Sequence, residues 1–432
     1  MGVGGAYVAS AEDTEGAAVN SASPAVRDPY STTWFDYDID LGISFPGAFA
    51  STDFDNHGDS AAPHAAASAF TALTVGGTLQ FGGLGVAAIG DLQQFSLSNL
   101  TQTAPITMQV GRWKALGAYG LFGGQLVVGG GARIVTMQIQ QSGAGNLLTM
   151  TGFGPEVGAL LMPTGQRWRI GATGRMPVTG GIFGSENVTE TGGLRKAGDF
   201  VLPGGVVQPW EIEAGLALQL GPRPINPGWE DPRDDDRELR GEIERDRDKR
   251  ALRYGTELAL LSPEGREARR REQAAEERAL RSIEDEHLDE ENQRLRKMRK
   301  ARYANWPREK ILLLASVLMT GPSPGVAYSV EGFADQVNIS PDRVGQVATF
   351  TPRMGMEGEP LQNRMLLRAG TYIEPSRYEA GSPRQHYTFG ADVRLFPLTF
   401  WGLLPDADWK IGLFVDLAPR YQNAGIGIGN WH

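Results

Sequence analysis

The sequence predicts an all-β protein: a transmembrane antiparallel β-barrel of about 14 strands, plugged by its N-terminal segment and interrupted by a charged helical insert. Three observations predict this fold. Long segments alternate apolar and polar residues, tryptophans mark the ends of these segments, and the chain starts with a stretch of small residues.

The first 31 residues differ in character from the rest of the chain. They are too rich in glycine and alanine for a robust helix, and their side chains are too small for a well-packed strand. A segment of this kind ahead of a run of strands is a disordered tail, a linker or a plug inside a barrel. We expect a plug.

The clearest strand covers residues 33–45, which alternate strictly between two faces. A period of two indicates a strand and excludes a helix. In a soluble sandwich the apolar face would lie inside, whereas in a membrane barrel it meets lipid and the carboxylates face the lumen. The apolar face carries Phe35, Tyr37, Ile39, Leu41, Ile43 and Phe45, and the other face carries Trp34, Asp36, Asp38, Asp40 and Ser44.

Further segments repeat this alternation over about ten to thirteen residues, which suits a tilted transmembrane strand better than the usual soluble strand of ~5–6 residues. The clearest are 167–176, 210–220, 364–373, 388–395 and 409–417. Further strands are expected over 68–81, 84–95, 104–115, 119–140, 147–163 and 166–177, and weaker ones over 325–333, 346–357 and 421–430. Tryptophans that we expect in interfacial girdles are Trp34, Trp113, Trp168, Trp210, Trp401, Trp409 and Trp431.

Composition narrows the function. The 432 residues carry a net charge of −10, which argues against a nucleic-acid binder with a basic face. The absence of cysteine excludes disulfides, thiol catalysis and cysteine-ligated metals. The longest apolar run, residues 311–319, is far shorter than the ~20 residues of a transmembrane helix. Residues 1–31 show no signal peptide, so we expect numbering that begins near the mature N-terminus or a start that was assigned late.

The segment from Trp229 to Arg308 is densely charged and mixes both signs. Ser262 and Pro263 make a good helix start, and residues 267–302 contain no proline or glycine. We expect a helical hairpin or one long helix outside the bilayer, serving either as a solvated spacer or as a docking arm for a protein partner. Counting strands from a turn at Thr164–Gly165 places this insert on the periplasmic side, and one miscounted strand would reverse that.

No catalytic constellation is visible, so we expect no enzyme activity, no cofactor and no metal. The histidines show no ligand spacing, and each is expected at the surface or in a loop. They are His57, His64, His287, His386 and His432.

The start of the chain resembles a known family. Gly2-Val3-Gly4-Gly5-Ala6-Tyr7-Val8, an acidic stretch, Asn20 and then Pro24-Ala25 resemble the hatch of the long-chain fatty acid transporter (FadL, toluene-X) family of outer-membrane proteins. Family members often read Asn-Pro-Ala directly, whereas Ser21-Ala22-Ser23 intervene here. Residues 153–161 with 169–175 resemble the family's middle hairpin, and Val201-Leu202-Pro203 resembles its Leu-Pro segment.

This resemblance implies a bacterial outer-membrane channel for passive uptake of hydrophobic compounds such as long-chain fatty acids, with outer-membrane lipid around it. We expect four domains: a hatch (1–31), a first barrel part (32–220), the charged insert (221–307) and a second barrel part (308–432). The insert is foreign to the family's pattern, and the resemblance covers the other parts. The implied gate comprises Gly4, Gly5, Ala6, Tyr7 and Asn20. A lumen arginine would either meet a ligand carboxylate or pair with a lumen acid; the candidates are Arg133, Arg169 and Arg368.

Two other functions stay open. The barrel could be a binding or secretion-complex component, as PorV-like proteins are, with its protein partner at residues 229–308; the charged insert favours this. Less favoured is a soluble all-β protein with a helical arm.

Overall fold

The computed structural model describes residues 2–27, 31, 33–46, 53, 56, 66–98, 106–142, 145–184, 188–191, 194–197, 200–202, 205–226, 228, 229, 231–304, 310–323, 327–329, 345–378, 381–398 and 407–431. These residues divide into two compact units. One holds residues 1–27, 35–228 and 307–432, and the other holds residues 28–34 and 229–306.

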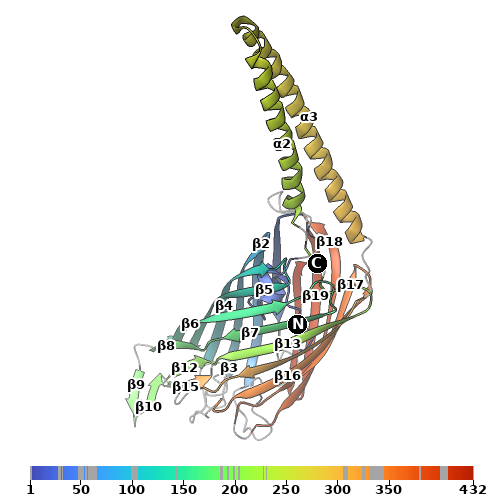
Figure 1. The fold of residues 1–432 in the computed structure, drawn as a ribbon. Helices are drawn as coiled ribbons and strands as arrows, with labels where there is room; N and C mark the ends of the chain where they lie inside the picture. Colours follow the sequence, from blue (N-terminus) through green and yellow to red (C-terminus); the bar gives the residue numbers. More distant parts are fainter. Residues whose placement is uncertain are drawn as a thin grey trace. The chain divides into compact units, whose positions relative to one another are not determined.

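The first unit is a closed antiparallel barrel of 14 strands, which confirms the predicted fold (Figure 1). Its strands are β1 (Phe35–Ser44), β2 (Ala66–Phe81), β3 (Leu84–Ser98), β4 (Ile106–Leu121), β5 (Leu126–Gln141), β6 (Gly145–Leu161), β7 (Trp168–Arg175), β13 (Glu211–Leu220), β14 (Ile311–Thr320), β16 (Thr349–Leu361), β17 (Met365–Glu374), β18 (Arg384–Leu398), β19 (Ala407–Ala418) and β20 (Tyr421–Asn430).

The barrel closes where its first strand meets its last. In β1, Asp40 pairs with Gly429 of β20 and Ser44 pairs with Gly425. In two other pairs of neighbouring barrel strands, smaller elements intervene in the sequence: β7 pairs with β13, and β14 pairs with β16. Closure leaves no unpaired sheet edge, which a lipid environment requires.

Alternation sets which side chains face out. In β14, Ile311 and Val317 are each 48% exposed on the outer face, whereas Leu312 and Leu314 face inward and are buried. The same pattern gives the barrel an apolar outer surface, as expected for contact with lipid. The charged residues of the strands lie mainly inside.

Four short turns lie at one end of the barrel, which we call the short-turn end. They join β2 to β3 at residues 82–83, β4 to β5 at 122–125, β6 to β7 at 162–167 and β16 to β17 at 362–364, whereas the opposite end has two, at 142–144 and 419–420, beside its longer connections. The chain leaves β13 and returns in β14 at the short-turn end, in agreement with the strand count from the sequence.

Small strands extend the sheet beyond the barrel. In this extension β8 (Val178–Gly184) pairs with β6 and with β12 (Gly205–Gln208), and β12 runs parallel to β15 (Ala327–Ser329). A separate small sheet comprises β9 (Val188–Thr191), β10 (Leu194–Ala197) and β11 (Phe200–Leu202).

The second unit contains a helical hairpin of α2 (Pro232–Ala259) and α3 (Pro263–Ala304), not one long helix. Asp231 caps α2 by accepting a 2.9 Å hydrogen bond from the Arg233 backbone, and Pro263 starts α3 as predicted. Charged pairs join the helices: Arg247 donates to Glu284 at 2.7 Å and Arg269 to Glu257 at 2.9 Å. Within the described residues, no helix is long and apolar enough to cross a membrane.

Several sequence predictions need correction. The expected strand over 119–140 is two strands, because the β4–β5 turn lies at 122–125. Trp113 lies in the middle of β4, and Trp409 is only 5% exposed, so neither belongs to an interfacial girdle. Trp168 does begin a strand, and Trp401 lies outside the described residues.

His386 is also not a surface residue. It is 1% exposed on β18, where its Nδ1 lies 2.9 Å from Asp416 and its Nε2 lies 3.0 Å from Glu374. The two carboxylates replace the hydrogen bonds that the ring loses to water, so His386 can be buried in a strand. The prediction of a surface or loop position was therefore wrong for His386. His287 is exposed on α3, and His57, His64 and His432 lie outside the described residues.

Candidate functional site

The hatch comprises residues 2–27 and lies inside the barrel. It contains one short helix, α1 (Asp13–Ala17), and one 3-10 turn, η1 (Ser23–Ala25). Val8, Ala11, Ala17, Ala22 and Asn20 are fully buried, at 0% exposure. Small residues let the hatch backbone lie directly against the wall, so the expected plug is confirmed.

Wall glycines make this close approach possible. A Cβ at Gly85 would lie 1.8 Å from the Pro24 carbonyl oxygen, and one at Gly129 would lie 2.0 Å from that of Ser21. The same holds at Gly171, 2.1 Å from the Val8 oxygen, and at Gly355, 2.4 Å from that of Val3. These four positions, on β3, β5, β7 and β16, together form the glycine belt that the hatch touches.

Two of the predicted gate residues anchor the ends of the hatch. Asn20 donates from its amide to the Val8 oxygen at 2.9 Å and to the Ala159 oxygen of β6 at 3.2 Å. The Gly4 backbone donates to the Thr388 hydroxyl of β18 at 2.7 Å. Gly4 adopts a positive φ of 63°, and its Cβ would lie 2.8 Å from the Thr371 backbone, so only glycine fits there.

The other predicted gate residues lie beside them. Gly5 accepts a 2.8 Å hydrogen bond from the Tyr7 backbone, and Ala6 is 2% exposed. Burial raises the pKa of Tyr7 well above its ordinary value, and the nearby Glu15 and Glu12 carboxylates raise it further. The Tyr7 phenol therefore stays neutral. Gating by these five residues stays a prediction.

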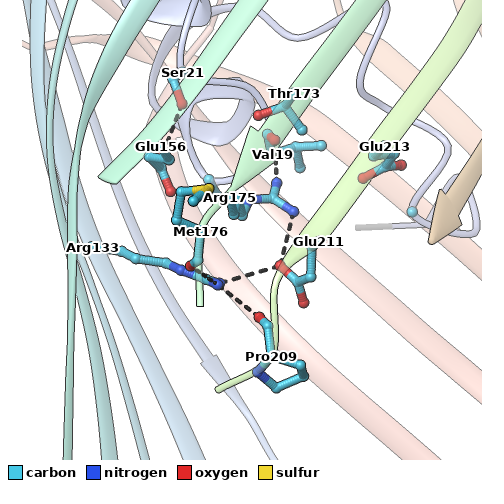
Figure 2. Close-up of polar contacts among 12 residues, drawn as sticks. Val19, Ser21, Arg133, Glu156, Thr173, Arg175, Met176, Pro209, Glu211 and Glu213 are labelled. Atoms are coloured by element: carbon cyan, nitrogen blue, oxygen red, sulfur yellow. Dashed lines mark hydrogen bonds and ion pairs between the residues drawn. The ribbon is translucent and has the colours of Figure 1, made fainter. Parts of the chain in front are cut away.

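A first charge cluster holds the C-terminal half of the hatch (Figure 2). Ser21 donates to Glu156 at 2.8 Å, and Arg175 donates to the Val19 carbonyl. Glu211 accepts from Arg133 at 3.3 Å and from Arg175 at 3.2 Å. Charge-assisted hydrogen bonds thereby join β6 and β7 to the hatch, and Glu211 joins β13 to β5 and β7.

Arg133 is engaged in this cluster through both of its terminal guanidinium nitrogens. Besides Glu211, it donates to the Met176 oxygen at 2.7 Å and to the Pro209 oxygen at 2.9 Å (Figure 2). Arg169 is likewise engaged elsewhere, since its Nε donates to Asn226 at 2.7 Å and it pairs with Glu12 of the hatch.

A second charge cluster surrounds Arg368 on β17. Arg368 donates to Glu357 at 2.8 Å and to Asp392 at 2.7 Å, and it lies 3.8 Å from Glu15 of the hatch. Lys410 binds Glu15 at 2.6 Å, and Lys310 pairs with Glu357. Three carboxylates thus face three cations. The structure places all three predicted arginines in ion pairs, and a role toward a ligand carboxylate stays a prediction.

The electrostatics of Glu15 follow from this arrangement. Burial alone would raise its pKa, but the charges of Lys410 and Arg368 lower the pKa well below its ordinary value of 4.5. Glu15 therefore carries its negative charge at neutral pH, and the hatch stays bound to these two cations.

A cavity of about 260 Å³ lies between the hatch and the wall. Its hatch side includes Val3, Tyr7, Glu15 and Val19, and Arg368 is the one predicted arginine that lines it. The wall side comprises Asp40, Gly42, Ile43, Ser44, Ala72, Thr74, Asp392, Gly412, Leu413, Phe414, Ile426 and Gly427.

A row of glycines makes room for this cavity. Gly42 of β1 pairs with Gly427 of β20, which pairs in turn with Gly412 of β19. Three neighbouring strands therefore present no side chain to the lumen at one level. The row is hard to predict from the sequence because glycine weakens a strand pattern; its signal is the alternation of Gly425, Gly427 and Gly429 with isoleucine.

No protein-family model matches the chain. No curated protein matches it either. Solved structures do match. A FadL homologue from Pseudomonas aeruginosa shows 10% identity over 99% of this chain and 96% of that chain, with a TM-score of 0.49. The toluene transporter TodX from Pseudomonas putida shows 10% identity over 100% and 97%, with a TM-score of 0.48. The CymD monoaromatic hydrocarbon channel shows 9% identity over 99% and 96%, with a TM-score of 0.47.

One of these structures is titled as a homologue of FadL, at 10% identity. The fold itself rests on the strand pairing and the hatch contacts of this chain. The protein is a transmembrane β-barrel of 14 strands with a hatch in its lumen, similar along nearly its whole length to structures titled as a FadL homologue and as hydrocarbon channels.

Proposed function

We propose that this protein is an outer-membrane channel for passive uptake of hydrophobic compounds, gated by the hatch. The observation that carries the proposal is the cavity between hatch and wall, in the lumen of a barrel whose outer surface is apolar. The hatch forms one side of this cavity. A hydrophobic compound could therefore bind there and be released when the hatch moves.

The charges favour neutral compounds over acids. Arg368 already has two carboxylate partners within 2.8 Å, so a fatty-acid carboxylate would have to displace Glu357 or Asp392. An aromatic hydrocarbon needs no such exchange and would contact Tyr7, Phe414 and the glycine row. Uptake of long-chain fatty acids stays a finer prediction of this proposal.

Filling the cavity tests the proposal. A Cβ at Gly42 meets its nearest atom at 3.9 Å, so Gly42→Leu fits and projects into the cavity. We expect uptake of radiolabelled toluene into proteoliposomes with a lipopolysaccharide outer leaflet to fall about tenfold, because the side chain takes the ligand's volume. The matched control is Gly117→Leu, where a Cβ has nothing within 4 Å. Equal uptake by wild type and Gly42→Leu would contradict the proposal, and the same assay with a labelled fatty acid tests the finer prediction.

We propose a second role for the helical hairpin, as a docking arm for a protein partner. Its tip exposes Leu260 at 84% and Leu261 at 38%, two adjacent apolar side chains, whereas the other exposed apolar residues of the helices, Leu252, Ile283 and Met298, are far apart in the sequence. A solvated spacer has no use for an apolar tip. The chain leaves β13 and returns in β14 at the short-turn end, and we propose that this end is periplasmic.

Excising the hairpin separates the two roles. Replacing residues 229–308 with a short glycine-serine turn removes the arm and keeps the β13–β14 pair. If the arm docks a partner needed for uptake, uptake falls in cells but not in proteoliposomes, where no partner is present. Leu260→Ser with Leu261→Ser should reproduce the loss in cells, and Leu252→Ser, also exposed on α2, is the control. Unchanged uptake in cells would rule out this docking role.

A further inference from the structure

The outer wall of the barrel carries a groove apart from the hatch, and Arg368, Leu413 and Phe414 line both this groove and the cavity. Its volume is about 830 Å³, and it crosses β14, β16, β17, β18 and β19. The side chains that line it belong to the lipid-facing set: Ile311, Met356, Leu367, Phe389 and Leu413 are between 41% and 56% exposed. The groove is therefore open to the membrane.

The pairing of the strands explains the groove. Along one row, Gly358 pairs with Leu367, Leu367 with Ala391, and Ala391 with Leu413. In the next row the small residue is Ala369, between Met356 and Phe389. Small residues thus form the floor and large ones the sides, which produces a hollow in a wall that is otherwise convex.

The groove begins at the short-turn end. Pro360 and Lys310 lie there, and the lining then runs through Gly358 to Met356. Four residues of a strand span ~14 Å, close to half of the ~30 Å hydrocarbon core. This length matches an acyl chain of the membrane leaflet that surrounds the short-turn end, because each leaflet contributes half of the hydrocarbon core.

A cationic side chain, that of Arg364, lies at the short-turn end of the groove. Arg364 lies in the β16–β17 turn, between the lining residues Pro360 and Leu367, and its side chain is exposed. Among the residues that the structure describes, Arg364 has no ion-pair partner, whereas Lys310 is already paired with Glu357. A phosphate group is the ligand that an unpaired guanidinium at a membrane surface suits best.

We propose that this groove binds one glycerophospholipid of the leaflet at the short-turn end, with an acyl chain between Phe389 and Leu413 and the phosphate at Arg364. The occupant is a lipid because the groove is continuous with the lipid-facing surface and its exposed lining is apolar, whereas the charged lining residues Glu359 and Arg368 are only 9% and 10% exposed. Such a bound lipid goes beyond the proposed channel function, and its test involves no transport.

Native mass spectrometry of the full chain, purified in mild detergent and incubated with phosphatidylglycerol, counts the bound lipid. The wild type should retain one phospholipid per chain. Ala369→Phe with Ala391→Phe fills the groove and should lower retention about tenfold, because the acyl chain loses its packing contacts. The matched control is Ala88→Phe with Ala115→Phe, a cross-strand pair exposed on β3 and β4.

Arg364→Gln is a second variant that leaves the barrel wall intact. It should lower retention of phosphatidylglycerol several-fold, because the phosphate loses its charged partner. Heat-modifiability on a gel verifies that every variant is a folded barrel. A wild type without bound lipid, equal losses in both double-phenylalanine variants, or a wild type that forms a dimer without lipid would each overturn the proposal.

Discussion

Replacing Gly85 with valine should dislodge the hatch and open the lumen to ions. A Cβ at this position would lie 1.8 Å from the Pro24 oxygen, and both the wall and the hatch meet there as backbone. No side chain can rotate away, so the hatch must move. Gln80 would then lose its hydrogen bonds to the Pro24 and Val26 oxygens, at 3.1 and 2.8 Å.

Conductance in a planar bilayer measures this opening directly. We expect the variant to show ion currents that the wild type does not, and a decrease of about 3 kcal/mol in the free energy of unfolding. Gly117→Val is the control, because a Cβ there has no neighbour within 4 Å. If Gly85→Val conducts no more than Gly117→Val, the hatch is not held by the glycine belt.

Replacing Arg368 with methionine should cause the largest loss of stability of any charge removal. Its guanidinium lies between Glu357 and Asp392, which are 4% and 5% exposed. Removing one partner of a buried ion pair leaves the carboxylates uncompensated and costs about 3–5 kcal/mol. Urea unfolding in detergent measures the loss.

A double variant distinguishes charge from packing. Glu357→Gln together with Arg368→Met removes one carboxylate with the cation, so we expect part of the stability to return. Arg167→Met, at an exposed arginine of the β6–β7 turn, should change the free energy of unfolding by less than about 0.5 kcal/mol. Equal effects of Arg368→Met and Arg167→Met would show that the second charge cluster contributes nothing.

Most of the barrel could be predicted from alternation alone. The strict pattern of residues 33–45 predicted that Asp38 of β1 faces inward, and it does, accepting a 2.8 Å hydrogen bond from the Thr14 backbone of the hatch; Tyr37, predicted on the apolar face, is only 3% exposed. Turn positions with glycine, such as 82–83, were equally clear. The β4–β5 boundary was not, because glycines continue through β5 and hide the turn at 122–125.

The site was less predictable, because its groups come from distant parts of the chain. Nothing in the sequence pairs Glu15 with Lys410, or Arg133 with Glu211. The alternation of its strand predicts that Arg368 faces the lumen. Only the three-dimensional structure shows that Glu357 and Asp392 already pair with its guanidinium. The predicted surface position of His386 was wrong for the same reason, since its partners Glu374 and Asp416 lie on neighbouring strands.

The way the hatch is anchored has a consequence for assembly of the chain. Its first residues bond to β18, where Thr388 donates to the Gly2 oxygen at 2.9 Å across 386 positions of sequence. The hatch segment is thus made 386 residues before its partner on β18, and its hydrogen bonds form only after that strand is present. Seating of the hatch and closure of the barrel become a single late step, and contacts of such long range make that step slow.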